Sequence, residues 1–300
     1  MRHALLVLFL IMLCVMTFGI GLYAGVKQTW PVAQLRRLVS QQANPTIVTD
    51  RFGRLLSYPG KIEIPCPARD DRTAVLLVIG QSNAANYQGQ RHQSKDDRVV
   101  NFAAGRCYRA ASPLLGADGR MGETWTLLGT KIVRSGLYHT VILIPVAVGG
   151  SEVRRWAKGG DLNAVMLAAI QAIKARYTIT GVLLNQGAAD FALRTPEAQY
   201  RSELASLIGS LRTGGVRAPF FITRSSVGGD DWTTDNPIAR AQTSLADDRR
   251  GIFDGPDTDR DVTTFDRYDG YHFSASGQEK YTDAWIPLLR AHPGVVEGTN

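Results

Sequence analysis

Residues 74 to 83 read AVLLVIGQSN, six apolar residues followed by Gly80, Gln81, Ser82 and Asn83. A continuous apolar run of this length is typical of a strand that is buried on both faces of a parallel sheet. In such sheets the functional side chains collect at the carboxyl ends of the strands. Ser82 comes directly after the strand, where the unpaired N–H groups of a following helix stabilise negative charge on a substrate oxygen. The stretch therefore predicts a parallel sheet and makes Ser82 a candidate nucleophile, although serines in this position commonly serve only as helix caps.

The rest of the chain repeats the alternation of strand and helix. Apolar runs predict further strands at Val141–Val148, Gly181–Leu184 and Pro219–Thr223. Amphipathic patterns predict helices at Asn163–Arg176, Pro196–Leu211, Pro237–Ala246 and Ser274–Arg290. Such alternation implies right-handed crossovers and a sheet covered by helices on both faces. We therefore expect an α/β fold, a three-layer α/β/α sandwich with a parallel, flavodoxin-like sheet.

The composition agrees with a folded domain and excludes several classes of protein. The 300 residues are 44% hydrophobic and 20% charged, which is typical of a globular chain and not of a disordered one. Gly 30, Pro 13 and Cys 3 are close to ordinary usage, which excludes collagen-like and disulfide-scaffold proteins. The net charge of +7 is not concentrated in long Lys/Arg runs, so we expect no nucleic-acid partner.

The first thirty residues predict a membrane anchor. No charged residue occurs from Ala4 to Val26, a stretch of 23 residues. A helix of that length would span about 35 Å, enough to cross a hydrocarbon core. Arg2 precedes the stretch and Lys27 follows it, which favours a single-pass signal anchor with its N-terminus in the cytoplasm. The alternative is a cleaved signal peptide and a secreted protein, for which Leu22-Tyr23-Ala24 is a poor cleavage site.

In both cases the remainder of the chain is exported to the periplasm or the cell exterior. Without the first thirty residues the net charge falls from +7 to +5, a mild bias that suits anionic glycans. Export also places Cys66 and Cys107 in an oxidising compartment. A disulfide between them and two separate buried thiols are both compatible with the sequence.

The predicted organisation has four segments. They are the anchor at 1–30, a stalk with a small β appendage at 31–71, the main domain at 72–292 and a tail at 293–300. The appendage is predicted from alternating residues between Thr46 and Pro65, interrupted by turns at Asp50–Gly53 and Pro59-Gly60.

A nucleophilic serine needs a base, usually a histidine that a carboxylate orients. Of the five histidines, His272 has such a partner, because Asp269 lies three residues before it, just ahead of the last predicted helix. Asp269 can accept the Nδ1–H of the imidazole, which leaves Nε2 to take the serine proton. A solvated surface turn is the competing interpretation of this motif.

Two other strand ends carry hydrogen-bond donors. The second strand leads into GGSEVRRW at 149–156, and the third leads into NQGAAD at 185–190. The glycines allow backbone N–H groups to approach a ligand closely. A backbone N–H from the first and an amide side chain from the second could complete an oxyanion hole with the N–H of Ser82.

Together these four stretches resemble a known family. GQSN at 80–83, GGSxVxxW at 149–156, QGxxD at 186–190 and DGYH at 269–272 resemble, in order, the sequence blocks of SGNH (GDSL-type) hydrolases, specifically the sialate O-acetylesterase-like carbohydrate esterases. The resemblance covers about residues 72–292. It implies that Ser82 is the nucleophile, His272 the base and Asp269 its orienting partner. It also implies an oxyanion hole formed by the amides of Ser82 and of Gly149 or Gly150, with the side chain of Gln186.

The same blocks supply the expected substrate contacts, which are Gln81, Asn83, Ser151, Asn185, Asp190 and Arg154. The third block departs from the family pattern, because relatives carry Trp and Glu where this chain has Leu184 and Ala188. The departure concerns the substrate contacts and leaves the triad intact.

The predicted function is therefore a membrane-anchored serine esterase that removes O-acetyl groups from a glycan. An acyltransferase that uses the same triad on a polysaccharide and a non-catalytic glycan-binding protein on the same fold remain open as alternatives. We expect no metal or cofactor, because the histidines and exported cysteines lack ligand spacing and a G-x-G-x-x-G motif is absent. Ala84 replaces the last glycine of G-x-S-x-G, which argues against an α/β-hydrolase. The sequence does not specify an oligomeric state.

Overall fold

The computed structural model describes residues 46–293. The predicted anchor lies outside these residues, as do residues 31–45 of the predicted stalk and appendage segment and residues 294–300 of the predicted tail. Within the described part of the chain, no helix combines the length and the hydrophobicity that a membrane crossing requires. The described residues from Ile47 onward form one compact unit.

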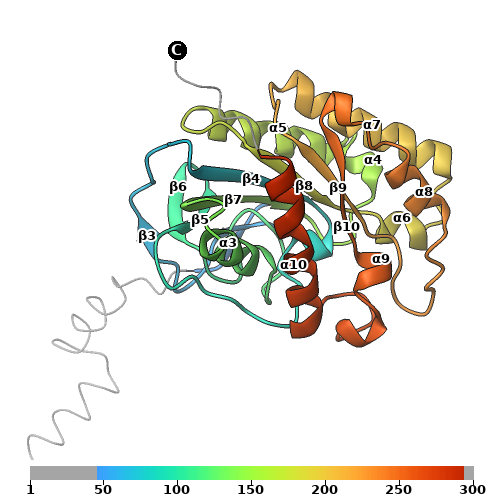
Figure 1. The fold of residues 1–300 in the computed structure, drawn as a ribbon, viewed down its shortest axis with the longest axis horizontal. Coiled ribbons are helices and arrows are strands. Elements are labelled where there is room, and N and C mark those ends of the chain that lie inside the picture. Colours follow the sequence, from blue (N-terminus) through green and yellow to red (C-terminus); the bar gives the residue numbers. More distant parts are fainter. Residues whose placement is uncertain (1–45, 294–300) are drawn as a thin grey trace, which may run out of the picture. The chain divides into compact units, whose positions relative to one another are not determined.

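The elements follow one another along the chain as the labels in Figure 1 indicate. The strands are β1 (Val48–Thr49), β2 (Leu55–Ser57), β3 (Glu63–Ile64), β4 (Thr73–Gly80), β5 (Val99–Ala103), β6 (Arg106–Arg109), β7 (Thr140–Ala147), β8 (Gly181–Asn185), β9 (Phe220–Arg224) and β10 (Ile252–Asp257). The α-helices are α3 (Trp125–Arg134), α4 (Val153–Trp156), α5 (Asp161–Lys174), α6 (Ala188–Ala192), α7 (Glu197–Thr213), α8 (Pro237–Thr243), α9 (Thr258–Asp261) and α10 (Ala275–Ala291). Short 3-10 helices are η1 (Ser82–Ala84), η2 (Asp248–Arg250) and η3 (Thr264–Asp266).

Eight strands form one sheet in the order β10-β9-β8-β4-β7-β5-β6-β3. The segment β5-β7-β4-β8-β9-β10 is parallel throughout. Its five strands β7-β4-β8-β9-β10 have the flavodoxin-like order, and β5 adds a further parallel strand beside β7. The expectation of a wholly parallel sheet was wrong, because β6 pairs antiparallel with β5 and β3 pairs antiparallel with β6. The physical reason is a tight hairpin, in which Ala104 (φ 50°) and Gly105 (φ 79°) reverse the chain between β5 and β6.

Helices cover both faces of the sheet, which confirms the α/β class (Figure 1). The central strand β4 is buried along its whole length, and its side chains point alternately into two hydrophobic cores, one on each face of the sheet. Its residues Val75, Leu77 and Ile79 pack with the apolar faces of α4, α5, α7 and α8. The alternate residues of β4 pack with α3 and α10 on the other face. Each face is buried because the side chains of a strand alternate with period two.

The residues that precede β4 are partly built into this unit. The antiparallel pair β1-β2 matches the small β appendage that we expected. However, β3 extends the main sheet, and the fully buried Leu55 exchanges backbone hydrogen bonds with Gly116 and Ala117. The predicted appendage is therefore not a separate structure.

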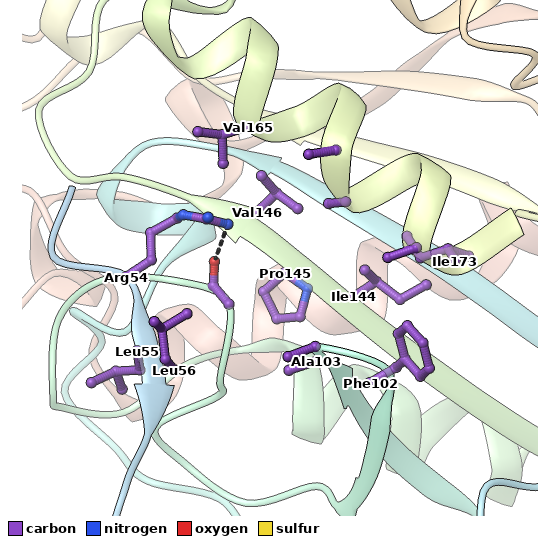
Figure 2. Close-up of a pocket in the computed structure, with 15 residues that line it drawn as sticks. Arg54, Leu55, Leu56, Phe102, Ala103, Ile144, Pro145, Val146, Val165 and Ile173 are labelled. Carbon is purple, nitrogen blue, oxygen red and sulfur yellow. Dashed lines mark hydrogen bonds between the residues drawn. The ribbon is translucent and has the colours of Figure 1, made fainter. Parts of the chain in front are cut away.

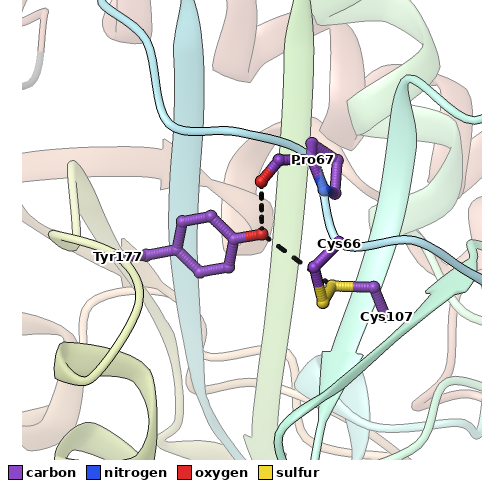
Figure 3. Close-up of a disulfide and its surroundings, with 4 residues drawn as sticks. All are labelled: Cys66, Pro67, Cys107 and Tyr177. Atoms are coloured by element: carbon purple, nitrogen blue, oxygen red, sulfur yellow. Dashed lines mark hydrogen bonds between the residues drawn. A yellow bond between two sulfur atoms is a disulfide. The ribbon is translucent and has the colours of Figure 1, made fainter.

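A disulfide joins Cys66 to Cys107, with the two Cα atoms 5.0 Å apart. It fastens the segment after β3 to β6, the strand next to the edge strand β3 (Figure 3). Tyr177 lies beside it and donates a hydrogen bond from its hydroxyl to Pro67 O at 2.8 Å. Of the two interpretations that the sequence left open for these cysteines, the structure has the disulfide.

The ends of β4 and β8 come unusually close together. Gly80 has φ +144°, and a Cβ atom built on it would lie 1.9 Å from the carbonyl oxygen of Asn185. Only glycine fits there, since any side chain would clash with backbone. The close approach brings the residues that follow Gly80 next to those that follow Asn185, at the carboxyl edge of the sheet.

Candidate active site

Ser82 is the first residue of η1, directly after β4. Its N–H group has no acceptor within the helix, because the first N–H groups of a helix are always left unpaired. The residue is partly exposed and opens into a pocket of about 410 Å³. The pocket is lined by Gln81, Ser82, Asn83, Tyr87, Gly149, Gly150, Ala188, Ala189, Ala192, Tyr271 and His272. The fold thus brings Ser82, the glycine turn after β7 and His272 to one cavity.

The Asp269–His272 turn has the geometry that the motif predicts. His272 Nδ1 lies 2.6 Å from Asp269 Oδ2. The other carboxylate oxygen, Oδ1, accepts hydrogen bonds from the backbone N–H groups of Tyr271 (3.0 Å) and His272 (2.8 Å). Partial burial opposes ionisation, but these hydrogen bonds, above all the one from the imidazole, hold the pKa of Asp269 below its usual range. The carboxylate is therefore ionised at neutral pH and fixes the ring through Nδ1.

The segment that carries His272 is tied to the segment that carries Ser82. Asn83 donates from Nδ2 to the carbonyl of Tyr271 at 3.2 Å. Gln88 accepts the N–H of Phe273 at 2.7 Å and donates to Asn83 Oδ1 at 3.0 Å. The residues on both sides of His272 are thus hydrogen-bonded to Asn83 and Gln88, which follow Ser82 in the chain. These bonds hold the two segments that carry the catalytic candidates at fixed positions relative to each other.

Two residues of the site were missed by the sequence analysis. The ring of Tyr87 stacks on the His272 imidazole, with centroids 5.5 Å apart and an interplanar angle of 21°. Its hydroxyl donates to Asp118 Oδ2 at 2.9 Å, and Asp118 Oδ1 accepts the N–H of Gly149 at 2.9 Å. Burial raises the pKa of Asp118. The only sequence signal was a polar stretch after Ser82 and a glycine-rich loop around residue 118.

Some of the predicted oxyanion donors are available at the pocket, and others are already hydrogen-bonded within the protein. The N–H of Gly149 is taken by Asp118, whereas the N–H of Gly150 has no acceptor within residues 46–293. The Gln186 side chain is not at the pocket, contrary to the prediction. It is fully buried, donates to Ser151 O (3.1 Å) and to Asp190, and accepts the Tyr200 hydroxyl (2.7 Å).

Gln81, in contrast to Gln186, lines the pocket. Its Oε1 accepts the N–H groups of Gly187 (3.2 Å) and Ala189 (3.1 Å). These two donors fix the orientation of the amide, because they require its oxygen and not its nitrogen. No acceptor for the Nε2 group of Gln81 is found among residues 46–293, so this group remains available as a donor on a residue that lines the pocket.

Most of the other predicted substrate contacts serve the structure instead. Ser151, Asn185 and Asp190 are fully or almost fully buried. Asp190 accepts the N–H of Val153 (2.9 Å), and burial raises its pKa. Ser151 donates to Val148 O at 2.7 Å, and Asn185 donates to the Tyr281 hydroxyl at 3.1 Å. Arg154 is exposed and forms an ion pair with Glu152. Of the six predicted contacts, Gln81 and Asn83 line the pocket.

Helix α6 supplies an apolar wall. Ala188, Ala189 and Ala192 line the pocket together, and Ala188 is one of the positions where the chain departs from the family pattern. Where the resemblance implies a carboxylate, this chain places the methyl group of Ala188 at the cavity surface.

A second cavity of about 290 Å³ lies between β2, β5, β7 and α5 (Figure 2). Its lining is apolar apart from Arg54, which donates to the carbonyl of Gly116 at 3.4 Å and pairs with Asp50. None of the candidate catalytic residues lines it.

Comparisons with known proteins identify a family and structures with a similar fold. Residues 72–281 match the family described as carbohydrate esterase, sialic acid-specific acetylesterase. Among solved structures, a protein from Arabidopsis thaliana superposes with a TM-score of 0.60 at 17% identity, covering 73% of this chain and 98% of that one. A lipase/acylhydrolase from Enterococcus faecalis superposes with a TM-score of 0.51 at 13% identity, covering 75% and 100%. A comparison with curated protein sequences finds no match.

Proposed function

Because the chain belongs to the carbohydrate esterase family of sialic acid-specific acetylesterases, and is thus a carboxylic ester hydrolase, we propose that it removes O-acetyl groups from a glycan through Ser82, His272 and Asp269. One observation carries the proposal. Ser82, Gly150 and His272 line the same pocket, and His272 is held through Nδ1 by a carboxylate 2.6 Å away. Nucleophilic catalysis by serine needs a base that a carboxylate orients and that faces the same cavity as the serine, so these positions support the proposal.

In the first half of the reaction, Ser82 Oγ attacks the acetyl carbonyl while His272 Nε2 takes its proton. The negative charge that develops on the carbonyl oxygen is stabilised by the N–H groups of Ser82 and Gly150 and by Nε2 of Gln81. Asp269 stays ionised and stabilises the imidazolium. The tetrahedral intermediate collapses when His272 returns its proton to the departing sugar oxygen, leaving the acetyl group on Ser82.

In the second half, water replaces the sugar. His272 removes a proton from the water, the resulting hydroxide attacks the acetyl carbonyl, and the same donors hold the oxyanion. The C–O bond to Ser82 breaks, the serine oxygen recovers the proton from His272, and acetate leaves. No cofactor takes part in this scheme.

We also propose that the enzyme works outside the cytoplasm, tethered by the uncharged segment from Ala4 to Val26 with its N-terminus inside. The Cys66–Cys107 disulfide supports export, because such bonds persist in oxidising compartments.

Acetate release from an O-acetylated sialic acid and from an acetylated xylose, with purified full-length chain, tests the proposal. We expect release without any added acceptor, and a rate lower by at least about a thousandfold in Ser82→Ala and His272→Ala. Ser225→Ala serves as the matched control, because Ser225 directly follows β9 and does not line the pocket.

Two results would contradict the hydrolase. Acyl transfer to a polysaccharide with negligible acetate release would indicate the transferase alternative. Glycan binding with no activity above the Ser82→Ala level would indicate the non-catalytic alternative.

A further inference from the structure

We propose that the exposed ring of Tyr271 is the binding surface for the sugar ring of the substrate, so that this residue selects carbohydrate esters over simple esters. The inference rests on the proposed function, because it gives the departing sugar a place in the pocket of Ser82. It adds a residue that neither the sequence blocks nor the family match assigns to substrate binding.

Tyr271 is a large exposed aromatic residue at the catalytic pocket. It lines the cavity together with Ser82 and His272, and 44% of its surface is exposed. Its ring centroid lies 6.4 Å from that of the His272 imidazole. A single exposed apolar side chain is ordinary on a protein surface, so its exposure alone indicates nothing. The way in which the structure supports this side chain is the stronger observation.

The backbone of Tyr271 is fixed on both sides by hydrogen bonds. Its N–H donates to Asp269 Oδ1 at 3.0 Å. Its carbonyl accepts from Asn83 Nδ2 at 3.2 Å and from Arg267 Nη1 at 2.7 Å. Arg267 is buried, and burial lowers its pKa to about 10. A buried guanidinium is thus directed at this carbonyl, so the peptide is held in place before any substrate binds.

The ring is backed by a glycine pair. A Cβ on Gly228 would lie 2.4 Å from Tyr271 Cδ1, and a Cβ on Gly229 would lie 2.2 Å from the phenol oxygen. The N–H of Gly229 donates to Gly270 O at 3.0 Å and joins the two loops. The ring therefore lies along bare backbone and shows its remaining surface to solvent. A tyrosine held in this way provides a flat, amphipathic contact at little cost in side-chain entropy.

The chemistry of the reaction places the sugar on this side of the pocket. His272 must return a proton to the departing sugar oxygen, so the sugar lies next to His272. Tyr271 is its immediate neighbour in the chain. The alanines of α6 form an apolar wall from a different element, and this wall suits the acetyl methyl. Sugar rings have apolar C–H faces and polar edges, which match an aromatic ring that carries a hydroxyl.

The test compares sugar esters with a sugar-free ester. The kcat and KM of the full-length chain are measured with an O-acetylated sialic acid, with an acetylated xylose and with ethyl acetate. We expect Tyr271→Ala to lower kcat/KM for the better of the two sugar esters, mainly by raising KM. This loss should be roughly three- to tenfold larger than the loss of kcat/KM for ethyl acetate. Tyr271→Phe keeps the ring and should preserve most of the preference. The control is Phe265→Ala, which removes an aromatic side chain that is 96% exposed on the same loop but outside the pocket.

An equal loss for sugar ester and ethyl acetate, or no loss at all, would overturn the role of Tyr271. A second arm does not depend on turnover. Calorimetric binding of the same sugar ester to Ser82→Ala should weaken when Tyr271→Ala is added, and unchanged binding would also reject the inference. Absence of Ser82-dependent hydrolysis in the unsubstituted chain would instead reject the proposed function, and the binding arm would still decide about Tyr271.

Discussion

Asp118 is the residue that links the two halves of the candidate site. Its carboxylate holds the N–H of Gly149 and the hydroxyl of Tyr87, whose ring stacks on His272. The glycine is needed here, because a Cβ at position 149 would lie 2.9 Å from the Tyr87 ring. Asp118 thus positions the turn that carries the N–H of Gly150. It also holds the Tyr87 ring that stacks on His272.

Asp118→Ala should therefore lower kcat more than it raises KM. Without the carboxylate, the N–H of Gly149 loses its acceptor and the glycine turn is free to move, which misplaces the next N–H. Loss of a well-placed oxyanion donor costs about a hundredfold or more in kcat, so we expect a decrease of roughly ten- to a hundredfold. Steady-state kinetics with an acetyl ester measure the split between kcat and KM.

Tyr87→Phe is the partner variant for this prediction, because it removes only the hydroxyl that Asp118 accepts and keeps the ring on His272. It should have a smaller effect on kcat. A rise in KM alone, with kcat unchanged in Asp118→Ala, would show that Asp118 does not position the oxyanion turn.

At the scale of elements, the connection between β10 and α10 carries the base and is held at several points. Arg267 donates to the carbonyls of Val262 (3.2 Å), Thr258 (3.1 Å) and Tyr271 (2.7 Å). Asp266 ends η3 and accepts from Lys280 Nζ at 2.7 Å and Ser276 Oγ at 2.9 Å, both on α10. The connection is thus fastened to the N-terminal half of the last helix, which fixes where His272 lies.

Asp266 should make the stability of the protein depend on pH in the acid range. Burial opposes its ionisation, but hydrogen bonds from Lys280, Ser276 and Thr263 hold the pKa of its carboxyl below the usual range. A carboxyl whose pKa is lower in the folded state stabilises the fold above its unfolded pKa, about 3.9, and loses this contribution as pH falls through the folded value. The free energy of unfolding of Asp266→Asn should therefore be below that of the unsubstituted chain at pH 7, and the difference should shrink below about pH 4.

Denaturant unfolding at a series of pH values measures that difference. Asp283→Asn is the control, because Asp283 is an exposed residue of α10 whose ion pair with Lys131 should contribute little. A deficit of Asp266→Asn that stays the same from pH 7 to pH 3 would argue against the role of the ionised carboxylate.

At the scale of the whole molecule, the disulfide joins the N-terminal part of the described chain to β6, the strand next to the edge of the sheet. Cys66 and Cys107 are separated by 41 positions, and the loop that they close contains β4, Ser82 and β5. Closing such a loop reduces the conformational entropy of the unfolded chain. The bond therefore stabilises the part of the fold on which the nucleophile depends, without touching the pocket.

Removing the bond in Cys66→Ala/Cys107→Ala should lower the free energy of unfolding by about 4 kcal/mol, as expected for a loop of this length. Reduction of the unsubstituted chain should lower it similarly, whereas the double variant should not respond to a reductant. Chemical unfolding with and without reductant measures both effects. Equal unfolding midpoints for the oxidised and the reduced chain would show that the bond does not stabilise the fold.

The sequence predicted the parallel core of the fold well and its edges poorly. The buried strands β4, β7, β8 and β9 were recognised, because a continuous apolar run can be identified in the sequence without knowledge of the strands that pair with it. In contrast, β10 was missed, since its sequence IFDGPD contains Gly-Pro, a usual turn signal, and only pairing with β9 makes it a strand. Helix α3 was missed because it follows a glycine-rich polar loop.

The fold class, the family and the four blocks at the strand ends could be recognised before the structure was known, because apolar periodicity and short motifs are local properties of the chain. The tertiary structure alone decided which polar groups reach the pocket. Gln186 is turned inward to Asp190 and Tyr200, Gln81 lines the cavity, and Arg267 binds the backbone carbonyl of Tyr271. Beyond the last residue of a strand the alternation of side chains ends, so the direction of each polar group depends on hydrogen-bond partners that are distant in the sequence.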